Sequence, residues 1–218
     1  MSVLVPGAGI GILGGGQLAR MMVMEARRLG YRTVVLDPSP DSPGGQMADV
    51  SIRGALDDLD AAKAVASQWD VVTLNTEQVP AGVLRTLETI VPVRPSARVL
   101  AVVQDRLEQR RYLEAAGVPQ VRYAPVDNLH AFETAAALTG LPGVLKTRRW
   151  GYDGRGQARV GTEADLLAAW NAVGQSTSIL ESYVAFEREI SVLLARGLDG
   201  DVRYYPIAEN EHRRHILH

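Results

Sequence analysis

A glycine-rich turn flanked by cations is the stretch of this sequence best suited to chemistry. It lies between Val144 and Val160 as strand, turn and strand, with glycines at positions 151, 154 and 156. Glycines let main-chain N–H groups curl around an anion, and Lys146 and Arg155 could bring positive charge to that anion. A hairpin whose glycines serve only the turn is the alternative. Three glycines in six residues exceed that need, so we interpret the stretch as a phosphate clamp.

A second glycine turn lies near the start of the chain, between a short apolar strand and a helix. Gly14, Gly16 and Ala19 satisfy the G-x-G-x-x-A pattern, which places a glycine turn at a helix N-terminus, where a phosphate is favoured. Asp37 follows this pattern by roughly 20 residues, the sequence separation at which NAD(P) enzymes have the carboxylate that binds the ribose. The pattern alone is weak, and it leaves an NAD(P)-binding Rossmann protein open as an alternative.

Neither the overall charge nor any hydrophobic segment indicates a nucleic-acid or membrane partner. The 218 residues carry a formal net charge of −2 and have a pI near 6.1, so any anion site must be local. Apolar runs are too short to cross a bilayer, and Met1–Pro6 lacks the basic start of a secretion signal. The absence of cysteine excludes disulfides, thiolate metal sites and cysteine nucleophiles. We therefore expect a cytoplasmic protein.

The order of elements predicts an α/β protein whose first domain covers residues 1–96. Short apolar strands alternate with helices up to a proline-punctuated link at residues 91–96, which predicts a doubly wound, Rossmann-like sheet. Glu77 follows the strand at residues 71–74, at the carboxyl end where open parallel sheets bind ligands. Glu77 is thus a site candidate, although a carboxylate that starts a helix before Pro80 would have the same position.

After the link, the pattern predicts an α+β arrangement with domains at residues 97–185 and 186–218. A single helix is expected over residues 97–116, with Arg106 in its middle, and a capping box at residues 162–165 opens a later helix. Alternation over residues 186–196 predicts one strand with Glu187, Glu189 and Ser191 on one face, able to hold a ribose or a metal, followed by a strand over residues 202–207. The histidines at 212, 215 and 218 do not predict a metal site, because no helical run or partner carboxylate accompanies them.

Several blocks together carry a family resemblance. They are Gly11–Met22, Val35–Pro38, Val71–Thr73, Glu77–Pro80, Val93–Ser96, Gln104–Arg106, Lys146, Gly151–Gln157, Glu187–Val192 and Asn210 with His212. The chain closely resembles the 5-(carboxyamino)imidazole ribonucleotide synthases, which are ATP-grasp ligases of purine biosynthesis. The resemblance implies a Rossmann-like pre-ATP-grasp domain followed by an incomplete α+β ATP-grasp domain. It also implies ATP-dependent carboxylation of 5-aminoimidazole ribonucleotide with bicarbonate, giving ADP and phosphate.

The resemblance further implies roles for individual residues. It implies catalytic roles for Lys146 and Arg155. Residues expected to bind ATP are Arg106, Lys146, Gly151, Tyr152, Asp153, Gly154, Arg155, Gly156, Gln157, Glu181, Ser182, Tyr183, Val184, Glu189 and His212. Residues expected to bind the ribonucleotide substrate are Gly16, Gln17, Leu18, Glu77, Tyr152 and Arg155.

The sequence also departs from the family pattern. Arg149 and Trp150 stand where the family usually has threonine or serine and glycine, and Asn75 stands in place of a candidate substrate carboxylate. The Mg²⁺ ligands of the family lie downstream of residue 218, so we expect Mg²⁺ as cofactor but no metal ligand among these residues. We accordingly expect the 218 residues to bind ATP weakly and not to turn over alone, which leaves a nucleotide-binding fragment without chemistry as an alternative. A homodimer is expected for the full-length family.

Overall fold

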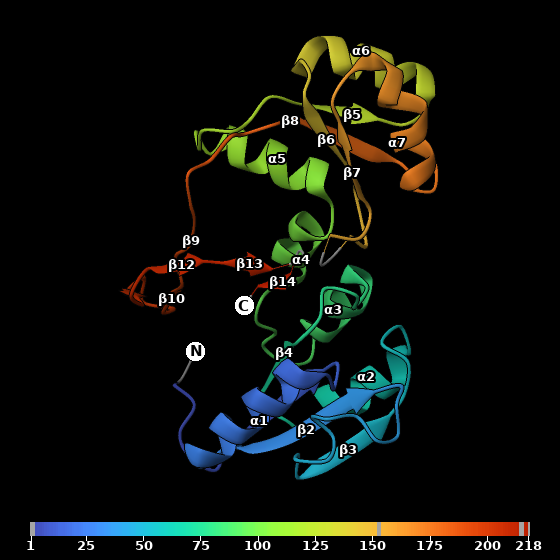
Figure 1. Ribbon diagram of the computed structural model, residues 1–218. Helices are drawn as coiled ribbons and strands as arrows, with labels where there is room; N and C mark the ends of the chain where they lie inside the picture. Colours follow the sequence, from blue (N-terminus) through green and yellow to red (C-terminus); the bar gives the residue numbers. More distant parts are fainter. Residues whose placement is uncertain (1–2, 152–153, 214–215, 218) are drawn as a thin grey trace. The chain divides into compact units, whose positions relative to one another are not determined.

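The structure is a computed structural model that describes residues 3–151, 154–213 and 216–217 (Figure 1). It divides into two compact units, Met1–Gln109 and Arg110–His218, each with its own sheet and core. Within the described residues, no helix is both long enough and apolar enough to span a bilayer. The predicted domain boundaries at residues 96 and 185 stay a prediction.

The first unit is the predicted doubly wound parallel sheet. Its strands lie in the order β3 (Val50–Arg53), β2 (Arg32–Asp37), β1 (Gly9–Leu13) and β4 (Val71–Leu74). The helices that accompany them are α1 (Gln17–Arg28), α2 (Leu59–Ala66), α3 (Ala81–Leu87) and α4 (Ala97–Val103). All three strand pairs are parallel, so the carboxyl ends of β1 and β4 lie at the same edge of the sheet.

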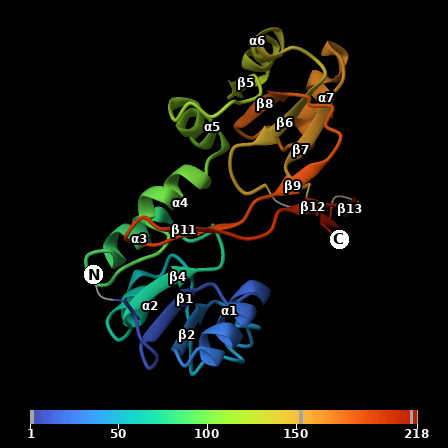
Figure 2. The ribbon, with the colours of Figure 1, turned by 90° about the vertical axis from the view of Figure 1, so that its left-hand side faces the viewer.

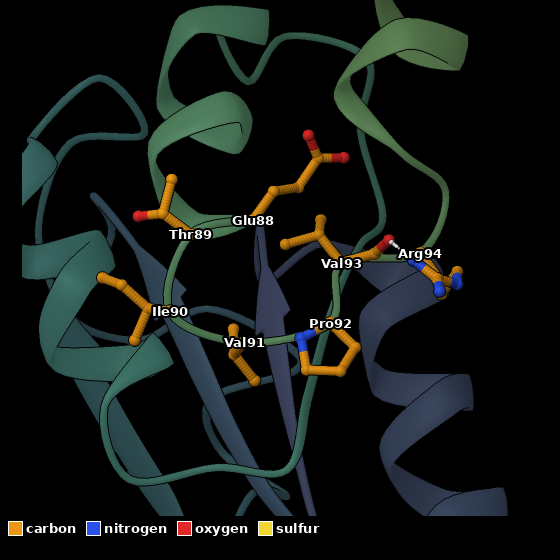
Figure 3. A pocket seen from close by; sticks show the side chains of 7 residues that line it. All are labelled: Glu88, Thr89, Ile90, Val91, Pro92, Val93 and Arg94. Carbon is orange, nitrogen blue, oxygen red and sulfur yellow. Dashed lines mark hydrogen bonds between the residues drawn. The ribbon is translucent and has the colours of Figure 1, made fainter. Parts of the chain in front are cut away.

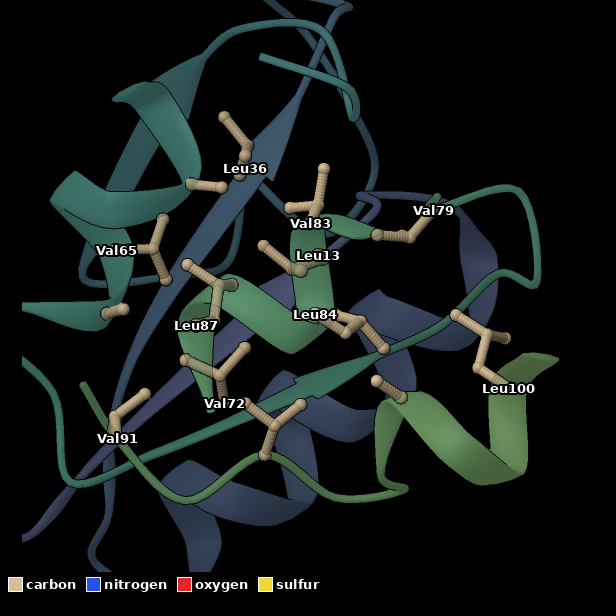
Figure 4. Close-up of a cluster of buried hydrophobic side chains, with 14 of the residues drawn as sticks. Leu13, Leu36, Val65, Val72, Val79, Val83, Leu84, Leu87, Val91 and Leu100 are labelled. Atoms are coloured by element: carbon tan, nitrogen blue, oxygen red, sulfur yellow. The ribbon is translucent and has the colours of Figure 1, made fainter. Parts of the chain in front are cut away.

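The alternation of side chains along the strands explains how the helices cover both faces of this sheet. Ile12 and Val35 point to helix α1, where they pack with Ala19 and Val23. Leu13 points to the opposite face, into a larger core that α2, α3 and α4 complete (Figure 4). Figure 2 shows α1 and α2 on opposite sides of the sheet.

The helix predicted over residues 97–116 is two helices, α4 and α5 (Arg106–Ala115), and Arg106 begins the second instead of lying in the middle of one. The carboxylate of Asp105 accepts hydrogen bonds from the N–H of Leu107 (3.0 Å) and of Glu108 (3.5 Å), and so caps a new helix. The side chain of Gln104 donates to the carbonyl of Val79 (2.7 Å). The single-helix prediction was wrong because a local cap competes with helix continuation.

The second unit is built on an antiparallel sheet. Its strands lie in the order β5 (Tyr123–Val126), β8 (Ser178–Ser182), β6 (Gly143–Thr147) and β7 (Gln157–Val160). Helices α6 (Leu129–Thr139) and α7 (Leu166–Ala172) pack on one face through Phe132 and Trp170, which contribute to one core with Leu145 and Leu180. The predicted capping box is confirmed, since Thr162 and Asp165 cap a 3₁₀ turn (Glu163–Asp165) before α7.

The two strands predicted over residues 186–196 and 202–207 are replaced in the structure by a larger number of shorter strands. Three two-stranded pairs are described: β9 (Glu189–Ser191) with β12 (Ala208–Asn210), β10 (Leu194–Arg196) with β11 (Val202–Tyr204), and β13 (His212–Arg213) with β14 (Ile216–Leu217). The strand predicted to run to residue 207 ends at Tyr204, two residues before Pro206, which has no N–H to donate to a continued ladder. Glu187 lies outside β9 and does not share the expected row.

Gly14 gives a test of why the first glycine turn needs glycine. Its φ is +90°, and a Cβ there would overlap the amide of Asn75. We expect Gly14→Ala to lower the free energy of unfolding of the first unit by about 2 kcal/mol, measured by urea denaturation. Gly82→Ala is the matched control: a Cβ at this helical position would lie 3.8 Å from the nearest side-chain atom, so that variant should gain about 0.5 kcal/mol. Equal effects of the two variants would contradict the argument.

Candidate functional site

A carboxylate shared by two cations lies on the face of the second sheet that α6 and α7 leave uncovered. Glu181 of β8 accepts a hydrogen bond from Lys146 Nζ on Oε2 (2.7 Å) and one from Arg110 Nε on Oε1 (2.8 Å). Strands β6 and β8 are adjacent, and Lys146 lies opposite Ile179. Because Glu181 is two residues after Ile179, its side chain points to the same face as that of Lys146. The Glu181 side chain is 7% exposed and each cation 24%.

The pKa of Glu181 reflects this balance. Burial raises the pKa of the carboxyl, but the hydrogen bonds and charges of Arg110 and Lys146 together outweigh burial and leave the pKa below its ordinary value of 4.5. Glu181 is therefore ionised at neutral pH.

Arg110 is itself fixed by the loop that follows helix α5. Its Nη1 donates to Gln120 Oε1 (2.6 Å), and the Gln120 amide donates to the carbonyl of Pro119 (2.9 Å). The guanidinium thus binds a carboxylate on one side and a neutral amide on the other. Sequence reasoning missed Arg110, because its partner Glu181 is 71 residues away.

The glycine turn between β6 and β7 has the left-handed backbone that its composition predicted. Gly154 and Gly156 have φ of +78° and +67°, and Trp150 shares this region with φ of +65°. A Cβ at Gly156 would lie 2.5 Å from Thr147 Oγ1, so only glycine fits there. The predicted contacts Tyr152 and Asp153 lie outside the described residues.

The segment Glu181–Val184, which the resemblance implies is the hinge whose main chain binds adenine, begins in β8 and continues past its end. The N–H of Ser182 donates to the carbonyl of Arg122 (2.9 Å), and that of Tyr183 donates to the carbonyl of Pro142 (3.0 Å). The guanidinium of Arg159 lies 4.9 Å from the centre of the Tyr183 ring, a distance at which the cation and the ring attract each other. Val184, which is half exposed, is the next residue of the hinge.

Two predicted nucleotide-site residues, Glu189 in β9 and His212 at the start of β13, lie close together. Glu189 Oε1 accepts a hydrogen bond from Asn210 Nδ2 (2.8 Å) and lies 3.8 Å from His212 Nδ1. Asn210 and Ser191 also bond to each other across the strands (2.9 Å). The carboxylate of Glu189 is therefore held by Asn210 and lies beside His212. The spacing of these residues in the sequence does not predict that they meet.

In the first unit, Asn75 lies at the glycine turn that precedes helix α1. With its amide oriented to satisfy both sides, the nitrogen donates to the Gly14 carbonyl (3.1 Å) and the oxygen accepts from the N–H of Gly16 and of Ala19 (3.3 Å each). Asn75 therefore caps α1, whose N-cap residue, Gly16, has no side chain to do so. Its position directly after β4 was the signal that could have identified this role.

The remaining residues of the first unit that were predicted to bind a ligand are Gln17, Leu18, Glu77 and Asp37. Gln17 and Leu18 begin α1 beside the capped turn, and Leu18 is 62% exposed. The Glu77 main-chain carbonyl accepts from Gln104 Nε2 (2.6 Å). Asp37 accepts from the N–H of Gly15 on one oxygen (2.7 Å) and from that of Ser39 on the other (2.8 Å).

One hollow in the described surface of the first unit lies away from these groups. It has a volume of about 400 Å³ and is lined by the segment Glu88–Arg94 (Figure 3), where Glu88 accepts from the N–H of Ala97 (2.8 Å). No predicted site residue lines it. Among the described residues, no three His, Asp or Glu side chains gather as a metal ion would need.

Two family models match the chain. The ribonucleotide synthetase preATP-grasp domain matches residues 8–104, and the ATP-grasp domain matches residues 111–218.

Relatives and solved structures agree with these matches. The N5-carboxyaminoimidazole ribonucleotide synthase of Brucella melitensis is 39% identical over 98% of this chain and 60% of its own length. N5-carboxyaminoimidazole synthetase from Staphylococcus aureus, complexed with ADP, has a TM-score of 0.96 at 34% identity, over 100% of this chain and 58% of that one. The Aspergillus clavatus synthase with ADP and 5-aminoimidazole ribonucleotide has a TM-score of 0.88 at 27% identity, over 97% and 55%. The chain thus spans 55% to 60% of the length of these proteins.

Replacing Glu181 should have a pH-dependent cost. Because its folded-state pKa lies below the ordinary 4.5, its stabilisation is present above that pH and is lost as the pH falls through the folded pKa. We expect Glu181→Gln to lower the free energy of unfolding by about 2 kcal/mol at pH 7, less than a fully buried pair because the cations are partly exposed. Urea denaturation should show this loss shrinking below pH 4.5. Glu133→Gln, on the exposed face of α6, should change stability by less than about 0.5 kcal/mol; a pH-independent loss at Glu181 would contradict the assignment.

Trp150 should be strained in the glycine turn. A bulky residue at φ +65° costs about 1 kcal/mol relative to glycine, and the side chain is 58% exposed, so little packing would be lost. We expect Trp150→Gly to stabilise the second unit by up to about 1 kcal/mol in urea denaturation. Gly154→Ala, the reverse change at φ +78°, should destabilise it. A loss of stability in both variants would count against strain at Trp150.

Proposed function

The chain belongs to the N5-carboxyaminoimidazole ribonucleotide synthase family of ATP-grasp proteins, and we propose that its residues bind the nucleotide and the ribonucleotide of that reaction. In the proposed reaction, an oxygen of bicarbonate attacks the γ-phosphorus of ATP, and the bond to ADP breaks. The amine of 5-aminoimidazole ribonucleotide then attacks the carboxyl carbon of carboxyphosphate. Phosphate leaves, and the amine nitrogen loses a proton.

The observation that carries this proposal is the ammonium of Lys146, fixed at 2.7 Å from Glu181 on the strand that leads into the glycine turn. Phosphoryl transfer to a weak nucleophile depends on positioned positive charge and main-chain N–H groups. We propose that Lys146 and Arg155 neutralise phosphate charge and that the turn at residues 151–157 covers the phosphates. Arg106 is proposed for the same nucleotide on the strength of the family pattern.

The base and the ribose would bind to the second unit as well. The N–H groups of Ser182 and Tyr183 are engaged within the sheet, so we propose that adenine is read by the main chain at Val184. Glu189 would accept from the ribose hydroxyls, with His212 beside it at 3.8 Å. The side chain of Glu181 has a different role, because both its oxygens bind cations.

The phosphate of the ribonucleotide would bind to the first unit. We propose the N–H groups of Gln17 and Leu18, at the start of a 12-residue helix, where N–H groups and the helix dipole favour an anion. Asn75 would hold that turn in shape while adding no negative charge. Contacts from Glu77, Tyr152 and Arg155 remain part of the proposal.

Further components are proposed from the family alone. They are bicarbonate as the second substrate, Mg²⁺ as cofactor, a homodimer and a cytoplasmic location. Among the described residues, no three His, Asp or Glu side chains gather to hold a metal ion. None of the steps above is therefore assigned to a metal held by these residues.

Two alternatives make different predictions. An NAD(P)-binding protein would use Asp37 for a ribose, but both oxygens of Asp37 already accept main-chain N–H groups, which disfavours it. A nucleotide-binding fragment without chemistry would bind ADP but release no phosphate.

Ligand-dependent thermal unfolding tests the proposal. We expect ADP and 5-aminoimidazole ribonucleotide each to raise the melting temperature, and NAD to leave it unchanged, because only ligands of the native state stabilise it. Lys146→Gln should abolish the ADP effect. The matched control, Lys63→Gln at a solvent-facing position of helix α2, should retain it. Stabilisation by NAD but not by ADP would overturn the proposal.

A further inference from the structure

Two cations share one carboxylate in the second unit, so the cluster of Arg110, Lys146 and Glu181 carries a net charge of one positive unit. We propose that Arg110 is a positioning residue: it binds one oxygen of Glu181 and thereby leaves the positive charge of Lys146 available to an anionic phosphate. The inference rests on the proposed nucleotide site at Lys146, and it assigns to Arg110 a role that the family pattern did not imply.

The contacts define how the carboxylate is divided. Arg110 Nε binds Oε1 and Lys146 Nζ binds Oε2, at 2.8 and 2.7 Å. Each cation therefore interacts directly with one oxygen, and neither is neutralised alone. Without Arg110, Glu181 and Lys146 would form a simple pair of zero net charge, and an incoming phosphate would have to compete with the carboxylate for the ammonium.

The surroundings of Arg110 suit a fixed positive charge. Gln120 binds its Nη1 at 2.6 Å through a neutral amide oxygen, which orients the guanidinium without adding negative charge. Glu181 and the two cations are largely shielded from water, with exposed fractions of 7% and 24%, so salt screens this charge less than it screens a surface charge.

The chain offers a direct reporter for the test. Lys63 and Lys146 are its only lysines, so ¹³Cε-lysine labelling of the 218-residue chain gives one signal from the cluster and one reference signal from helix α2. ADP is the probe, and its dissociation constant is read from the shift of the Lys146 signal. The method also measures weak binding.

We expect Arg110→Gln to weaken ADP binding about tenfold, as expected for removal of one charge from a partly buried site. Arg110→Lys keeps the charge and loses the Gln120 contact, so we expect a loss of no more than about threefold. Arg203→Gln removes the same formal charge from an exposed position on β11 and should bind ADP as the wild type does.

The double variant Arg110→Gln with Glu181→Gln distinguishes charge from architecture. It leaves Lys146 as the only charged group of the cluster and so restores the net positive unit. We expect it to bind ADP more tightly than Arg110→Gln alone, whereas a purely structural role predicts a further loss. The double variant also removes the carboxylate of Glu181, which in Arg110→Gln would stay buried with only one of its two cations and so would destabilise that variant.

The outcomes separate the two proposals. If ADP moves neither lysine signal in the wild type, the nucleotide site at Lys146 is wrong and this inference falls with it. If ADP moves the Lys146 signal equally in wild type and Arg110→Gln, or if the double variant binds more weakly than Arg110→Gln, the nucleotide site stands and the role of Arg110 is refuted.

Discussion

The second unit depends on keeping one carboxylate ionised where water scarcely reaches. Burial alone would favour the protonated acid, and an isolated buried charge would be strongly destabilising. Glu181 remains charged because helix α5 and strand β6 each direct a cation to one of its oxygens. The same contacts tie three elements together on one face of the sheet, opposite the apolar core beneath α6 and α7. Structure and proposed chemistry therefore rest on the same interaction.

Local patterns in the sequence predicted most of the fold. Alternation and helical periodicity are short-range signals, so the doubly wound sheet and the α+β arrangement could be recognised from them. The errors occurred where a single residue competes with a periodic pattern. Asp105 caps a new helix within an apolar run, and Pro206 ends a strand that alternation would continue. Both residues were visible in the sequence, but their effect depends on backbone geometry.

The candidate site was predictable to the extent that its motifs are continuous in sequence. The glycine turn and the residues after β8 are such motifs. Arg110 was not predicted, because nothing near it in the chain indicates a partner 71 residues away. Asn75 was noticed only as a departure from the family, and its contacts with Gly14 and Gly16 depend on two strands ending at one edge of the sheet. Tertiary pairing of this kind is not encoded in spacing.

The exposed Trp150 gives the glycine turn an optical property of its own. The chain has three tryptophans: Trp170 is buried in the second core, and Trp69 is partly buried under the guanidinium of Arg32. Only the indole at position 150 is mostly in water. Its emission should therefore dominate any solvent-dependent change in the intrinsic fluorescence of the native protein, so that movement of this turn can be followed in real time without an added dye.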